Sequence, residues 1–133
     1  MHIVLVDDDE IILHIHEQMI SNCVDNVNIN KYNCPEKFLQ NLLAGTIALP
    51  DLIISDYDME PYNGVKLLTR LELIAGKLNF DMKKLQFYMV SGERNLEKIC
   101  KNCESTIFSG YFYKPLMENH LSKLLKSDKI SNH

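Results

Sequence analysis

Short apolar runs alternate with helical periodicities along almost the whole chain, and this alternation limits the fold more than any other feature. Four runs are rich in β-branched or aromatic side chains, which is typical of strands buried on both faces of a parallel sheet. A fifth segment alternates apolar and polar residues, as an edge strand does. The four runs are residues 3–6, 52–54, 87–90 and 111–113, and the edge segment is residues 27–32.

Between these runs, apolar side chains recur at the spacing of amphipathic helices, and Gly and Pro separate the elements. Five such units predict an α/β fold, a three-layer, doubly wound (βα)5 sandwich with a parallel five-stranded sheet. The five stripes are Ile12, Ile15 and Met19; Phe38, Leu39, Leu42 and Leu43; Val65, Leu68, Leu71 and Ala75; Leu96, Ile99, Cys100 and Cys103; and Met117, Leu121, Leu124 and Leu125.

Length and charge narrow the classes of function. The chain has 133 residues and a formal net charge of −4. We expect one domain over residues 1–126 and a polar C-terminal tail, residues 127–133, that frays. An acidic chain is a poor partner for nucleic acid, because phosphate binding needs a basic face. We also expect no membrane partner, since no apolar run is long enough to span a bilayer.

The cysteines raise the alternatives of a metal site or a redox motif. Cys100 and Cys103 form a C-x-x-C pair, but Cys23 and Cys34 form no second close pair. A structural zinc site normally has that second pair, and a redox motif sits where a strand gives way to a helix. We therefore expect free thiols packed on a buried helix face. Without a secretory signal, we expect them reduced and the protein cytoplasmic.

Chemically useful side chains follow the predicted strands directly. In a doubly wound sheet, ligands bind outside the carboxyl ends of the strands. The residues at those ends are Asp7, Asp8, Asp9 and Glu10 after the first run, Asp56 and Asp58 after the third, Ser91 after the fourth, and Lys114 after the fifth.

Carboxylates crowded at one edge of a sheet call for a cation. Two carboxylates about 4 Å apart repel by roughly 4 kcal/mol at an effective dielectric constant of about 20. Asp7, Asp8 and Asp56 would therefore recruit a divalent ion, and oxygen ligands favour Mg²⁺ or Mn²⁺. Asp9 and Glu10 instead suit the start of the next helix. A metal on carboxylates beside a lysine and a hydroxyl suits phosphoryl transfer to a carboxylate.

Five motifs in this order resemble the receiver domain of bacterial two-component response regulators, such as chemotaxis regulators. The resemblance covers residues 3–125 and implies a flavodoxin-like sheet of strand order 2-1-3-4-5. The motifs are Val6-Asp7-Asp8-Asp9-Glu10, Asp51-Leu52-Ile53-Ile54-Ser55-Asp56, Met59 with Gly64, Val90-Ser91-Gly92, and Gly110-Tyr111-Phe112-Tyr113-Lys114-Pro115.

The resemblance implies a role for each acidic residue. Asp56 would accept a phosphoryl group from a sensor histidine kinase or a histidine phosphotransfer protein in a Mg²⁺-dependent phosphorelay. Asp8 would bind the ion directly, Asp7 through water, and Asp58 through its backbone carbonyl. The domain would label itself and lose the phosphoryl group slowly, so we expect no enzyme in the sense of multiple turnover.

The resemblance also implies a switch. Ser91 would be the switch hydroxyl, Lys114 the family's lysine and Tyr111 the aromatic switch residue, with a cis peptide bond between Lys114 and Pro115. A downstream protein target would bind the surface of the fourth helix, fifth strand and fifth helix. A dimer that forms on phosphorylation is a further alternative.

Two departures from the family pattern stand out. Family members usually have Pro directly after the methionine that Met59 matches, whereas here Glu60 intervenes before Pro61. Asp58 adds a carboxylate two residues beyond the acceptor. The sequence does not determine how this carboxylate changes the metal affinity or the lifetime of the phosphoryl group.

Two alternatives belong to other classes. Asp56-Tyr57-Asp58 also matches the D-x-D of haloacid-dehalogenase-type phosphatases, although that motif usually follows the first strand and here follows the third. The other alternative is a phosphorylation-independent interaction module. Such degenerate domains lose the acceptor, the acidic pair or the lysine, and this chain retains all of them.

Overall fold

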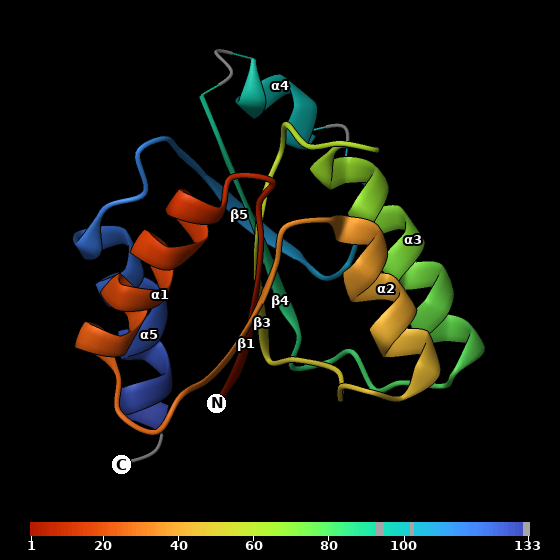
Figure 1. Ribbon diagram of the computed structural model, residues 1–133, viewed down its shortest axis with the longest axis horizontal. Coiled ribbons are helices and arrows are strands. Elements are labelled where there is room, and N and C mark those ends of the chain that lie inside the picture. The colour runs from red at the N-terminus through yellow and green to blue at the C-terminus, as the bar shows by residue number, and fades with distance from the viewer. Residues whose placement is uncertain (93–94, 102, 132–133) are drawn as a thin grey trace.

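The computed structural model describes residues 1–92, 95–101 and 103–131, and in them strands and helices alternate as predicted (Figure 1). The strands are β1 (His2–Val6), β2 (Asn28–Tyr32), β3 (Leu52–Asp56), β4 (Gln86–Ser91) and β5 (Phe108–Tyr113). The helices are α1 (Glu10–Cys23), α2 (Pro35–Ala44), α3 (Gly64–Lys77), α4 (Leu96–Lys101) and α5 (Glu118–Ser131).

All strands run parallel in the order β2-β1-β3-β4-β5, which confirms the predicted fold class and sheet order. The segment with alternating polarity is indeed an edge strand, β2. The expectation that residues 111–113 are buried on both faces is wrong. Strand β5 forms the other edge of the sheet, and most of its residues are half-buried or exposed.

Helices cover both faces of the sheet, with α1 and α5 side by side on one face and α2 and α3 on the other (Figure 1). Phe38 of α2, Leu71 of α3 and Leu96 of α4 pack into one core cluster with Phe87 of β4. Leu13 of α1 and residues of α5 pack into the second cluster on the opposite face. These two cores hold the strands in place, and the acidic, hydroxyl and lysine side chains lie at the carboxyl ends of the strands.

The buried face of α1 differs from the predicted one. Leu13, His16 and Ile20 are buried, whereas Ile15 of the predicted stripe is 45% exposed. Both sets have nearly the same helical spacing, so periodicity cannot separate them. Packing against α5 buries the set that contains the polar His16, and it leaves the apolar Ile15 exposed to solvent.

Local signals fix where the first three helices begin. The Asp9 side chain accepts hydrogen bonds from the Ile11 and Ile12 amides at 2.9 and 3.4 Å, so Asp9 caps α1 as predicted. Pro35 occupies the first turn of α2, where a missing amide proton costs nothing. Asn63 caps α3 by accepting from the Lys66 amide at 3.0 Å.

The last two helices depart from their predicted ends. Helix α4 ends at Lys101, so Cys103 lies beyond it, although the Cys103 amide still donates to the Cys100 carbonyl at 3.1 Å. Helix α5 continues to Ser131 and thus includes residues 127–131 of the segment expected to fray, since no Pro or Gly interrupts it. The final two residues of that tail lie outside the described residues.

The four cysteines are free, as expected. Cys100 is buried, and burial together with the neighbouring Cys103 raises the pKa of its thiol to about 11. A neutral buried thiol behaves as a small apolar side chain, and so it suits the packing role. Among the described residues, no helix is both long and apolar enough to cross a bilayer.

Two leucines on α3 give a matched test of the core. Leu71 is fully buried and Leu73 is 64% exposed. We expect Leu71→Ala to lower the free energy of unfolding by about 2–5 kcal/mol, and Leu73→Ala to change it by less than about 0.5 kcal/mol. Urea unfolding followed by circular dichroism measures both. Equal losses for the two variants would contradict the packing described.

Candidate functional site

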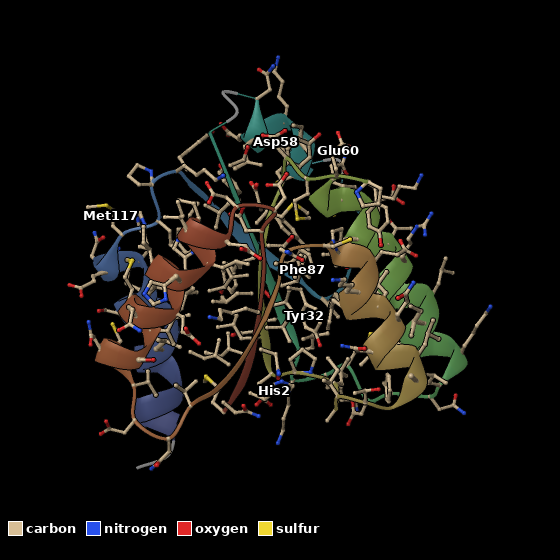
Figure 2. All side chains as sticks on the ribbon, viewed as in Figure 1. His2, Tyr32, Asp58, Glu60, Phe87 and Met117 are labelled. Carbon is tan, nitrogen blue, oxygen red and sulfur yellow. The ribbon has the colours of Figure 1, made fainter. Side chains whose placement is uncertain are left out.

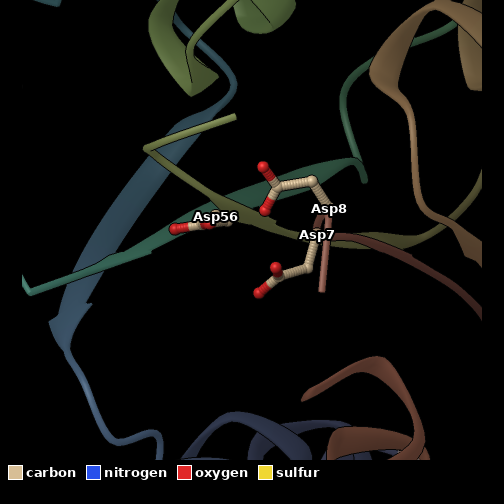
Figure 3. A group of neighbouring side chains, drawn as sticks. All are labelled: Asp7, Asp8 and Asp56. Atoms are coloured by element: carbon tan, nitrogen blue, oxygen red, sulfur yellow. The ribbon is translucent and has the colours of Figure 1, made fainter. Parts of the chain in front are cut away.

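The register of the central strands brings two acidic motifs together. Val6 of β1 pairs with Ser55 of β3, so the next residues, Asp7 and Asp56, lie side by side at the carboxyl ends of these strands. Asp8 follows on the loop into α1. Figure 3 shows the three carboxyl groups of Asp7, Asp8 and Asp56 gathered at this edge.

The same register carries the lysine and the hydroxyl to that edge. Asp56 pairs with Val90 of β4, which places Ser91 one residue beyond. Ser91 in turn pairs with Tyr113 of β5, and Lys114 follows directly. The Lys114 amide donates to the Ser91 carbonyl at 2.9 Å, which continues the ladder past the last strand residue.

The three carboxylates form a compact cluster. One oxygen from each lies within 4.8 Å of the others, with Asp7 and Asp56 buried and Asp8 exposed. Three converging oxygen ligands, one of them open to solvent, suit a hard divalent cation that keeps several waters. The residues present therefore fit Mg²⁺ or Mn²⁺.

Lys114 provides a positive charge at this cluster. Its Nζ lies 3.2 Å from Oδ1 of Asp56 and 4.0 Å from Oδ2 of Asp7. Burial alone would lower the pKa of the ammonium group, but the Asp56 and Asp7 carboxylates outweigh that effect and raise it. Lys114 therefore stays charged at neutral pH and offsets part of the repulsion among the acids.

Burial dominates the two inner acids. It raises the pKa of Asp7 to about 6, although the Asp9 amide, which donates to Oδ1 of Asp7 at 2.9 Å, opposes the shift. Burial also raises the pKa of Asp56, against the charge of Lys114 and a 3.3 Å hydrogen bond from the Asp58 amide. Burying these two carboxylates in charged form therefore costs free energy, which the charge of Lys114 offsets in part.

Gly64 allows the backbone to pass close to Asp56. A Cβ at this position would lie 3.0 Å from the Asp56 carbonyl oxygen and 3.3 Å from Cα of Tyr57. Both are backbone atoms that cannot move aside cheaply, so a side chain would displace the strand end. Steric crowding thus explains why the motif of Met59 with Gly64 has a glycine at its second position.

Asp58 contributes more than a backbone carbonyl. Its Oδ2 accepts a hydrogen bond from Oγ of Ser91 at 3.2 Å, which joins the β3–α3 loop to the end of β4. The sequence predicts no contact between the Asp58 side chain and Ser91. The only sequence signal was its spacing of two residues from Asp56, which does not determine a contact with Ser91.

Tyr111 lies away from the carboxylate cluster. It is half-buried on β5, packs edge-on against Tyr113 with ring centroids 5.7 Å apart, and contacts the core cluster that includes Leu96. The Lys114–Pro115 peptide bond is cis, as the resemblance implied, and so is the Glu60–Pro61 bond.

An apolar groove of about 420 Å³ flanks Lys114, lined by Ile12, Ile15 and His16 of α1 together with Pro115 and Leu116. Burial and the nearby charge of Lys114 lower the pKa of His16. Ile11 of α1 and Met117, which follows Leu116, are also exposed, at 72% and 51%.

Comparison with known proteins points to one family. The family model described as the response regulator receiver domain matches residues 3–126. No curated protein matches the chain significantly.

Solved structures share the fold at low sequence identity. A two-component response regulator from Legionella pneumophila superposes with a TM-score of 0.76 at 19% identity, over 97% of this chain and 98% of that one. The signal receiver domain of an HD domain-containing protein from Pseudomonas fluorescens Pf-5 gives 0.74 at 24% identity, over 99% and 88%. The chemotaxis response regulator CheY4 of Vibrio cholerae gives 0.66 at 22% identity, over 95% and 96%.

The raised pKa of Asp7 predicts a pH dependence of stability without metal. Between about pH 4 and pH 6 the folded state binds more protons than the unfolded state, so stability falls as pH rises through this window. Asp7→Asn should reduce this fall, because only the contribution of Asp56 remains, and it should be more stable than the parent protein at pH 7. Thermal unfolding in chelator across this range measures the difference.

Asp25→Asn is the control for the pH series, because Asp25 is exposed. Its melting temperature should follow the parent protein at every pH. If Asp7→Asn also follows the parent throughout, the burial penalty at Asp7 is absent.

Proposed function

The chain belongs to the response regulator receiver domain family, and from that premise we propose that Asp56 is the phosphoacceptor of a two-component phosphorelay. The observation that carries the proposal is the ion pair of Asp56 with Lys114, 3.2 Å long, inside a buried carboxylate cluster. A carboxylate held beside a fixed ammonium group can attack phosphorus while the lysine stabilises the oxygens of the transferred group.

The proposed step is a transfer between two side chains. An Asp56 carboxylate oxygen forms a bond to phosphorus, and the P–N bond to a histidine of the donor breaks, with its electron pair returning to the imidazole. With acetyl phosphate as donor, a P–O bond breaks instead and acetate leaves. Slow hydrolysis by water then restores Asp56, so the domain cycles as a signalling module.

Asp7, Asp8 and Asp56 are the residues that would hold Mg²⁺, with the Asp58 backbone carbonyl as a further ligand. Their oxygens lie within 4.8 Å of one another. When bound, the ion supplies positive charge that offsets the negative charge of the incoming phosphoryl oxygens. Asp7 contributes from the interior and Asp8 from the solvent side.

Phosphorylation would act through Ser91 and Tyr111. A phosphoryl group on Asp56 adds about −1.5 to −2 charge and strong acceptor oxygens. Lys114 pairs with one oxygen, and Ser91 moves inward to donate to another. Tyr111, two residues before the pairing partner of Ser91 on β5, then turns inward, and the surface of α4, β5 and α5 changes for a downstream protein target or a second copy.

The phosphodonor would be a sensor histidine kinase or a histidine phosphotransfer protein in the cytoplasm. It must reach Asp56 from the edge where Lys114 is accessible, and the apolar groove of α1 borders that residue. An apolar surface next to the reacting group suits a protein donor. The acidic net charge of −4 does not suit nucleic acid.

The phosphatase alternative differs from this proposal in turnover. A phosphatase using Asp56 and Asp58 would clear many equivalents of substrate, whereas a receiver takes up one phosphoryl group and loses it slowly. A phosphorylation-independent module would take up none. Both alternatives are tested by the labelling experiment that follows.

Incubation with acetyl phosphate and Mg²⁺ should add one phosphoryl group, and Asp56→Asn should abolish the labelling because the attacking carboxylate is gone. Intact-mass spectrometry measures the addition. Asp8→Ala should label far more slowly at low Mg²⁺ and show weaker Mg²⁺ binding by calorimetry.

Asp9→Asn is the matched control for this experiment. It removes a neighbouring acid that caps α1, and Asn caps equally well. It should label like the parent protein. Labelling of Asp56→Asn to the level of the parent, or release of many equivalents of phosphate, would contradict the proposal.

The switch predicts where beryllofluoride, a phosphoryl mimic, changes the protein. With Mg²⁺ present, backbone amide shifts should extend from Asp56 and Ser91 to Tyr111 and α4. Asn30 of β2 lies at the edge of the sheet opposite β5, so its amide is the internal control and should shift little. Shifts confined to the carboxylate cluster would rule out this route of signalling.

A further inference from the structure

The Asp58 side chain connects the acceptor carboxylate to the switch hydroxyl. Its Oδ2 accepts from Oγ of Ser91 at 3.2 Å, and its backbone amide donates to Oδ1 of Asp56 at 3.3 Å. Ser91 is fully buried at the end of β4, whereas Asp58 belongs to the loop between β3 and α3. The unphosphorylated protein thus holds the Ser91 hydroxyl toward this loop.

A serine hydroxyl carries a single proton to donate. In the proposed function, that proton is the one offered to a phosphoryl oxygen on Asp56. The bond to Asp58 and the bond to the phosphoryl group therefore exclude each other.

We propose that the Asp58 carboxylate is a latch that holds the Ser91 hydroxyl in the unphosphorylated state, so that a phosphoryl group on Asp56 must displace Asp58 before the switch completes. The proposal rests on the proposed function. Asp58 acts through Ser91 and is a positioning residue, not a catalytic one. Its effect is to oppose the active state and to set how much phosphorylation the domain needs.

Charge offers a competing explanation of any effect of Asp58. A carboxylate on the loop beside Asp56 also repels a phosphoryl group directly, and this repulsion does not need Ser91. The latch and the repulsion both predict that removing Asp58 favours the phosphorylated form. They differ in whether the gain depends on the Ser91 hydroxyl, which a double-mutant cycle measures.

The first experiment measures beryllofluoride affinity at saturating Mg²⁺ by titration of backbone amide resonances. Asp58→Ala should tighten binding about three- to tenfold, the range for loss of one competing hydrogen bond. The same substitution in a Ser91→Ala background should change affinity by less than about twofold. Equal tightening in the two backgrounds, or no tightening in the first, overturns the latch.

Asp58→Asn separates charge from hydrogen bonding, because it removes the charge and keeps an acceptor oxygen for Ser91. It should tighten binding less than Asp58→Ala does. Equal tightening by both variants would assign the effect to charge. Glu60→Ala is the matched control, since Glu60 is an exposed acid on the same loop (Figure 2), and it should show no coupling to Ser91.

The second experiment needs neither metal nor a phosphoryl mimic. Three-bond couplings report the χ1 rotamer of Ser91 in the unliganded protein, which should be single in the parent and averaged in Asp58→Ala. A single rotamer in both proteins overturns the latch even if Asp56 is phosphorylated normally. Failure of the parent to take up a phosphoryl group, with the rotamer released as expected, contradicts the proposed function instead.

Discussion

The ion pair between Lys114 and Asp56 is the interaction on which the arrangement of the site depends. Asp7 and Asp56 are buried side by side, and burial opposes their ionisation. Lys114 reaches both, at 3.2 Å from Asp56 and 4.0 Å from Asp7, and its positive charge makes a buried anionic cluster tolerable. The remaining negative charge is what gives the cluster its attraction for a further cation.

The parallel sheet brings the two partners of this ion pair to the same edge. Val6 pairs with Ser55, and Ser91 pairs with Tyr113, so the residue after each strand lands at the same edge. The two apolar cores fix the strands that position these side chains. Gly64 completes the arrangement, because any side chain there would press on the Asp56 carbonyl.

Features specific to this chain lie in loops and at helix surfaces. On α1, the structure buries His16 and exposes Ile15 of the predicted apolar stripe, and both residues line an apolar groove bordering Lys114. On the β3–α3 loop, the Asp58 carboxylate accepts a hydrogen bond from Ser91 at the end of β4. Neither feature follows from a motif, since each depends on which neighbouring element packs against the segment.

The sequence by itself determined the order of elements, the parallel sheet and the identity of the acidic, lysine and hydroxyl residues at its edge. It did so because strand and helix periodicities are local, and because the residue after a buried parallel strand must lie at the carboxyl edge. Only the tertiary structure decided the buried face of α1, the exposure of β5 and the partner of Asp58. These are set by contacts between segments distant in sequence, where two faces or two rotamers satisfy the local pattern equally well.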